Sequence, residues 1–196
     1  GLASADSIFN YSADTSKYLG KYSLFYEDVA NKLTIDQVLD PKIKFTQSGF
    51  DVLNFGVTES TYWLQFKVAN HSAYTNLILN VENPLLNSLT LYIVRPGLPL
   101  DSVHLAPGNC GVIDHQFFTF SLDIDKGETV QYILRAQTNT QMIIPVSIYS
   151  REGTISQMLS FDLRTGIFAG IMLAMLLYNL FLYISARDRQ YLYYVN

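Results

Sequence analysis

The chain has 196 residues, a formal net charge of −4 and a hydrophobic content of 49%. Its positive charges are scattered and form no basic stripe, so we expect no nucleic-acid partner. With one cysteine, Cys110, an intrachain disulfide is excluded. The zinc-protease, nucleophile-elbow and phosphate-loop motifs of common enzymes do not occur. Together these features favour a binding protein over an enzyme, with no cofactor and no resident metal ion.

Residues 1–20 are polar and aperiodic, and they predict an N-terminal tail rather than a regular element. Within them, Ala3-Ser4-Ala5 has the small-x-small pattern of a signal-peptide cleavage site. Residues 1–5 are therefore compatible with the remnant of an export signal, and equally with ordinary chain.

Residues 21–150 have the pattern of short β-strands. Apolar residues alternate with polar ones over 61–69, 76–83 and 88–94, and again in runs that begin at Phe118, Val130 and Met142. Clusters of turn-forming residues separate these runs. A short helix is predicted to begin at Thr34, since Thr34 and Gln37 have capping-box spacing. About eight such strands predict a two-sheet sandwich or barrel.

Residues 151–165 predict a helical stalk, and residues 166–186 predict a transmembrane helix. The second segment is 21 residues long and uncharged, and it spans about 30 Å as a helix, the thickness of a bilayer's hydrocarbon core. Arg187 and Arg189 follow at once, so the positive-inside rule places residues 187–196 in a cytoplasmic loop and the large domain outside.

Small and polar residues within the span predict helix packing. Gly166, Gly170 and Ala174 recur every four residues, which allows a second helix to approach closely. Asn179 lies on the opposite side, and a polar residue in the membrane normally seeks a protein partner. Neighbouring helices on both sides are expected, although a lone anchor with incidental Gly and Asn is the alternative.

Trp63 is the strongest candidate for ligand contact. It alternates with the apolar residues of its strand and shares a face with Gln65, while Arg135 points away from the apolar set of its own run. A flat aromatic ring beside amides and a guanidinium group suits a sugar, since the ring stacks on the sugar and the polar groups bond its hydroxyls. The competing interpretation is that Trp63 packs beneath a loop or the helix at 35–39.

Two segments resemble a known family of bacterial seven-transmembrane receptors with diverse intracellular signalling modules. Residues 166–195 are similar to its first membrane helix and the following loop, and residues 26–150 are similar to its type 2 periplasmic domain. The residues that carry this second likeness are Glu27-Asp28, Leu33-Thr34, Asn54-Phe55-Gly56-Val57-Thr58, Thr61-Tyr62-Trp63-Leu64, Glu82-Asn83-Pro84-Leu85-Leu86, Leu91-Tyr92, Leu134-Arg135 and Pro145.

The resemblance implies a jelly-roll-like antiparallel β-sandwich related to carbohydrate-binding modules, standing in the periplasm on the bacterial inner membrane. It also implies six further membrane helices and a cytoplasmic output such as a histidine kinase or a cyclic-dinucleotide enzyme. The family often has charged residues where this chain has Gln65, Asn87 and Gln116. Because amides suit neutral hydroxylated ligands, we predict a carbohydrate or related small molecule bound by Trp63, Gln65, Asn87, Gln116 and Arg135.

Three other functions compete with this prediction. The domain could bind a protein partner or form a homodimer, in which case an apolar patch around Trp63, Tyr92 and Tyr149 is expected. It could sense calcium through the acidic segment 123–128, which reads more simply as a hairpin turn. A membrane-tethered hydrolase would need paired carboxylates such as Glu82 and Asp123, which nothing in the sequence pairs.

Overall fold

The computed structural model describes residues 8–13 and 18–186. The chain forms two units with a boundary after Thr154, and each is described by itself. The predictions made for residues 1–5 and 187–196 lie outside the described residues.

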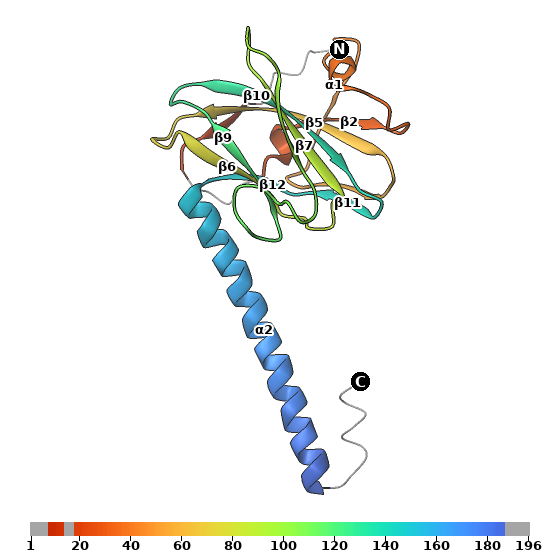
Figure 1. Ribbon diagram of the computed structural model, residues 1–196, viewed down its shortest axis with the longest axis vertical. Helices are drawn as coiled ribbons and strands as arrows, with labels where there is room; N and C mark the ends of the chain where they lie inside the picture. The colour runs from red at the N-terminus through yellow and green to blue at the C-terminus, as the bar shows by residue number, and fades with distance from the viewer. Residues whose placement is uncertain (1–7, 14–17, 187–196) are drawn as a thin grey trace. The chain divides into compact units, whose positions relative to one another are not determined.

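Strands of the first unit form a β-sandwich (Figure 1). One layer is a seven-stranded sheet of order β3-β2-β5-β10-β7-β8, with β1 parallel to β5. Its strands are β1 (Ile8–Tyr11), β2 (Leu24–Asp28), β3 (Thr46–Gln47), β5 (Thr61–Asn70), β7 (Ser88–Val94), β8 (Asp101–Leu105) and β10 (Thr129–Gln137).

The other layer consists of two smaller antiparallel sheets. One has the order β12-β6-β9, and the other pairs β11 with β4. Their strands are β4 (Leu53–Val57), β6 (Asn76–Val81), β9 (Phe118–Asp123), β11 (Gln141–Ile144) and β12 (Val146–Ser150). The predicted all-β antiparallel sandwich is confirmed.

The alternating apolar residues of both layers meet in one buried core. Leu64 of β5 and Leu134 of β10 face each other in register and are fully buried, as are Leu79 of β6 and Phe120 of β9 in the opposite layer. Burial of such side chains contributes about 1.5–3 kcal/mol each. Pro145 divides the run predicted from Met142 to Ile148, and its two halves belong to different sheets.

The prediction of an irregular N-terminal tail over residues 1–20 is wrong for the part of this segment that the structure describes. Residues 8–11 form β1, which pairs with the second half of β5, and Phe9 and Tyr11 are buried in the core. Leu19 is also buried and precedes a 3-10 turn, η1 (Gly20–Tyr22). The segment lacked a recognisable period because its strand is only four residues long.

Two α-helices complete the described structure. Helix α1 (Ile35–Val38) begins at Thr34 with the predicted capping box, in which Thr34 N donates to Gln37 Oε1 at 3.0 Å. Helix α2 (Arg151–Ala186) is continuous through the predicted stalk and span. Its 36 residues give a length of about 54 Å. Among the described residues, α2 is the one helix that is long and apolar enough to cross a membrane.

Candidate functional site

The outer face of the seven-stranded sheet brings three of the five predicted ligand residues together. Arg135 of β10 pairs in register with Trp63 of β5, and Gln65 lies two residues further along β5 on the same side. The predicted alternation is therefore confirmed, since these residues face away from the core formed by Tyr62, Leu64 and their neighbours.

Trp63 does not offer an exposed ring to a ligand. It is 1% exposed and packs in a second apolar cluster with Val38 of α1 and Ile133 of β10. The Tyr92 ring stacks beside it at 6.0 Å, and the Arg135 guanidinium lies 5.8 Å from its ring centre. The expectation of an open stacking platform is thus corrected, and the competing interpretation is confirmed, because α1 covers the face on which Trp63 lies.

The other two predicted contacts lie away from this cluster. Asn87 is exposed just before β7, and its Oδ1 accepts a hydrogen bond of 3.3 Å from Thr138 Oγ1. Gln116 is exposed in the loop before β9, a strand of the opposite layer. The structure therefore does not gather all five residues into one site.

The apolar patch expected for a protein partner is not exposed. Trp63 and Tyr149 are both buried, and Tyr92 is half-buried. Tyr149 also pairs with Ile78 in the β12-β6-β9 sheet, so it does not share a sheet with the other two aromatic residues.

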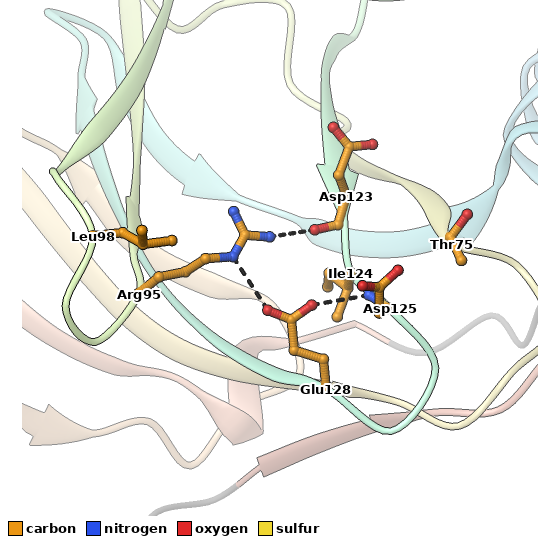
Figure 2. A pocket seen from close by; sticks show the side chains of 7 residues that line it. All are labelled: Thr75, Arg95, Leu98, Asp123, Ile124, Asp125 and Glu128. Atoms are coloured by element: carbon orange, nitrogen blue, oxygen red, sulfur yellow. Dashed lines mark hydrogen bonds and ion pairs between the residues drawn. The ribbon is translucent and has the colours of Figure 1, made fainter.

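A pocket of about 430 Å³ lies where the β7–β8 hairpin meets the β9–β10 turn (Figure 2). Arg95 and Leu98 reach it from the first hairpin, and the remaining side chains come from the β9–β10 turn and the start of β6. Its lining consists of Thr75, Arg95, Leu98, Asp123, Ile124, Asp125 and Glu128.

Arg95 and Glu128 form the wall of this pocket. Arg95 directly follows β7 and Glu128 directly precedes β10, and the pairing of these two strands brings their side chains together. The Nε atom of Arg95 lies 3.2 Å from Glu128 Oε1, and its Nη2 donates to the backbone carbonyl of Asp123 (Figure 2). Glu128 Oε2 accepts from the backbone N–H of Asp125 at 2.9 Å.

Asn70, at the end of β5, holds the loops around the pocket in place. Its buried Nδ2 donates to the carbonyl oxygens of Tyr74 at 2.6 Å and Ile124 at 2.8 Å. Its backbone carbonyl accepts from Gly127 N at 2.7 Å. Gly127 has a φ of +86°, which favours glycine, so the β9–β10 turn is fixed by both its sequence and its neighbours.

Tyr132 lies in the core close to the same charged residues. Its ring stacks on Phe66 at 5.7 Å, and its hydroxyl is buried with no hydrogen-bond partner among the described residues. Burial raises the pKa of Tyr132 well above its ordinary value, and the nearby charges of Arg95, Glu128 and Asp123 modify it. A neutral, unpaired hydroxyl is thus close to the charges of the pocket.

The acidic segment 123–128 forms a hairpin turn, as its sequence predicted. In the part of the chain that the structure describes, no group of three or more His, Cys, Asp or Glu residues could hold a metal ion. The hydrolase alternative also lacks its carboxylate pair. Asp123 pairs with Asn76 at the first residue of β6, whereas Glu82 follows the last, about 20 Å away along an extended strand.

Comparison with known proteins identifies the family. The 7TMR-DISM extracellular 2 family model matches residues 20–150, and the 7TM diverse intracellular signalling model matches residues 161–196. This chain belongs to the 7TMR-DISM receptor family. A comparison with curated proteins found no match. The two matches make the sandwich the extracellular sensor domain of a transmembrane signalling receptor, and α2 leads into its membrane part.

The pocket of this 7TMR-DISM domain was not predicted as a ligand site. The sequence pattern indicated a turn or a calcium site for segment 123–128, and Asp123 was also considered as half of a hydrolase carboxylate pair. The missing signal is the pairing of β7 with β10, which joins Arg95 to Glu128 across 33 positions of sequence.

Proposed function

We propose that this sensor domain binds a small polar ligand, of which a carbohydrate is the favoured class. The observation that supports this is a pocket of about 430 Å³ with a guanidinium group, carboxylates and the Thr75 side chain on its walls. Such groups are the donors and acceptors that sugar hydroxyls require.

The position of the pocket suits a signalling role. Asn76 Nδ2 donates to the pocket residue Asp123 at 3.1 Å, and the next residue of β6, Leu77, pairs with Ser150 at the end of β12. Ser150 Oγ in turn accepts from Gly153 N at 3.0 Å in the first turn of α2. A ligand that shifts Asp123 would therefore act on β6, which pairs with β12, the strand that continues directly into α2.

The rest of the signalling route is also proposed. The domain would stand in the periplasm of a bacterial cell, and α2 would pass the bound state to six further membrane helices. Gly166 and Gly170 have open space around them in the helix unit, while Asn179 Nδ2 donates to Met175 O at 3.0 Å within its own helix. Close packing of another helix at the glycines would suit this role. The output would be a histidine kinase or a cyclic-dinucleotide enzyme, and the receptor could act as a homodimer.

A thermal-melting screen of the detergent-solubilised chain tests the ligand proposal. Because Trp63 is the only tryptophan and is buried, its fluorescence reports unfolding of the sandwich. The probes are neutral sugars, acidic sugars, and calcium with a chelator control. A ligand that binds the folded state alone raises the melting temperature.

Four variants locate the binding. Asp123→Asn changes the pocket, and Arg135→Gln changes the outer face, where Gln65 and Arg135 remain predicted contacts. Asn87 and Gln116 are substituted by alanine in the same series. Loss of the sugar shift in one variant places the site, whereas no shift from any sugar refutes the carbohydrate proposal.

A further inference from the structure

The segment that carries α1, residues 33–45, is held on the domain by few polar contacts. At its start, the Oδ2 atom of Asp28 in β2 accepts a hydrogen bond of 2.8 Å from Leu33 N. From Thr34 to Lys44, every hydrogen bond among the described residues is made within the segment, by the capping box, by α1 and by the turn that follows it. The charged side chains of this α1 segment form no ion pair with the rest of the described chain.

The apolar attachment of the α1 segment is equally small. Val38 is its one buried side chain, at 3% exposure, and packs on Trp63 and Ile133 with three half-buried residues of the segment around it. This cluster shares no residue with the main core on the other face of the sheet. A segment with few buried contacts and exposed backbone bonds can open locally while the rest of a domain stays folded.

The side chains beneath the α1 segment have hydrogen-bond donors that the domain does not use. Trp63 Nε1 is buried and has no hydrogen-bond partner among the described residues. The Arg135 guanidinium lies 5.8 Å from the centre of the same indole ring. A guanidinium has five N–H donors, yet the one hydrogen bond of Arg135 within the described chain goes to Gln137 Oε1 at a long 3.4 Å. Two incompletely used donor groups therefore lie at one aromatic ring.

We infer that the α1 segment is a flap over a closed ligand site, whose floor is the Trp63 ring and the Arg135 guanidinium. When the flap opens, the ring surface that Val38 covers becomes free to stack on the apolar face of a sugar. The indole N–H and the guanidinium only donate, so they require acceptor oxygens, and a carboxylate suits a guanidinium best. The ligand class is therefore a sugar acid. Because the site shares no residue with the pocket of Arg95 and Glu128, the inference goes beyond the proposed function.

Hydrogen exchange of the Trp63 indole N–H, measured in the detergent-solubilised chain, tests whether the flap opens. Trp63 is the only tryptophan, so its indole proton gives a single NMR signal that can be followed in deuterated water. If the flap opens locally, this proton exchanges faster, relative to its intrinsic rate, than the amide of Leu64, which is fully buried in β5. Equal protection of the two protons would mean that Trp63 is exposed only by global unfolding, and would overturn the inference.

Val38→Ser should increase the exchange rate of the Trp63 indole proton about tenfold, because it removes most of the apolar burial that holds the flap closed. Leu39→Ser is the matched control. Leu39 is the next residue, is 40% exposed and lies outside the cluster beneath α1, so its substitution should leave the rate unchanged. An unchanged rate in Val38→Ser would show that the flap does not control access to Trp63.

Calorimetric titration of the same chain with glucuronate, glucose and lactate tests the ligand class. Glucuronate has a sugar ring and a carboxylate, glucose lacks the carboxylate, and lactate lacks the ring. A charge-assisted hydrogen bond is worth about a factor of ten in affinity, so glucuronate should bind at least about tenfold more tightly than glucose. Lactate should bind more weakly than glucuronate because it cannot stack. Arg135→Gln should abolish the advantage of glucuronate over glucose.

Val38→Ser should also bind glucuronate more tightly, by up to about tenfold. The apparent affinity of a ligand that binds only the open form is reduced by the fraction of molecules that are open, so a variant that opens more often binds better. If Val38 were merely structural, its substitution would weaken binding or leave it unchanged. Leu39→Ser should bind glucuronate as the unsubstituted chain does.

The binding experiments refute the flap site if glucuronate does not bind, if glucose binds as tightly, if Arg135→Gln keeps full affinity, or if Val38→Ser binds no more tightly. Asp123→Asn separates this site from the pocket. Sugar binding that is lost in Asp123→Asn and kept in Arg135→Gln would support the pocket and refute the flap site. The reverse result would support the flap site and refute the pocket.

Discussion

Asn80, in the middle of β6, donates a hydrogen bond of 3.2 Å from its Nδ2 to the Oγ1 of Thr154 in the first turns of α2. Both side chains are buried, at 3% and 0% exposure, so this bond is shielded from solvent. Asn80 lies on the same strand as Asn76, which contacts the pocket residue Asp123. One strand therefore connects the pocket to the residues with which the chain enters its membrane helix.

Thr154→Val should destabilise the sandwich by about 1–3 kcal/mol. The substitution keeps the side-chain shape but leaves the buried Asn80 Nδ2 unpaired, and Asn80 Oδ1 already has no partner among the described residues. Urea unfolding monitored by Trp63 fluorescence measures the change. Thr165→Val is the control, since Thr165 is exposed and bonds only within its own helix, to Phe161 O at 3.0 Å. Equal stability of both variants would show that the Asn80–Thr154 bond contributes nothing.

Trp63→Ala should unfold or strongly destabilise the domain rather than remove a ligand contact. Truncating a buried tryptophan costs about 3–5 kcal/mol, and here it removes the side chain on which α1 and Tyr92 pack. Circular dichroism during thermal unfolding measures the loss, because this variant lacks the fluorescent reporter. Phe50→Ala, at a residue 76% exposed, should change the free energy of unfolding by less than about 0.5 kcal/mol. A stable Trp63→Ala variant would contradict the buried packing.

Trp63 also shows how far the sequence predicts this structure. Period-two alternation correctly placed Trp63 and Gln65 on the face opposite Leu64, because alternation depends only on the local geometry of a strand. Alternation alone could not decide between an exposed Trp63 ring and one covered by α1, about 25 residues earlier, since the packing of a distant segment leaves no mark on the strand's own pattern.

The candidate pocket could not be predicted from the sequence for a related reason. Arg95 and Glu128 sit in two separate turns, and each turn alone reads as a simple connection between strands. Only the non-local pairing of β7 with β10 brings the two turns together in the lining of one pocket. The capping box at Thr34 and the helix from the stalk into the span were predictable, because both depend on residues close together in the chain.

Tyr132→Phe should leave the free energy of unfolding unchanged or raise it by up to about 1 kcal/mol. The Tyr132 hydroxyl is buried without a partner among the described residues, so its removal relieves a desolvation cost and breaks no bond. Tyr18→Phe provides the contrast, since it loses a hydrogen bond of 3.2 Å to Glu82 and should be destabilised by about 0.5–1.5 kcal/mol. Urea unfolding of the two variants under identical conditions compares them. A destabilised Tyr132→Phe variant would show that the hydroxyl makes a stabilising bond.

The stability of the sandwich should fall as the pH rises from about 10 to 12. Burial, aided by a hydrogen bond to the Glu27 carboxylate, raises the pKa of Tyr62 to about 12 from its ordinary value of 10.0. A pKa raised in the folded state means that the folded chain retains a proton which the unfolded chain releases above pH 10. The stabilisation is therefore complete below pH 10 and is lost progressively as the pH approaches 12. Tyr62→Phe keeps the ring that stacks on Phe55 at 3.9 Å but cannot titrate, so its melting temperature should decline less steeply across this range. Parallel curves for Tyr62→Phe and the unsubstituted chain would show that Tyr62 titrates normally, and would place the alkaline loss on other groups such as Tyr18, whose pKa burial also raises to about 12.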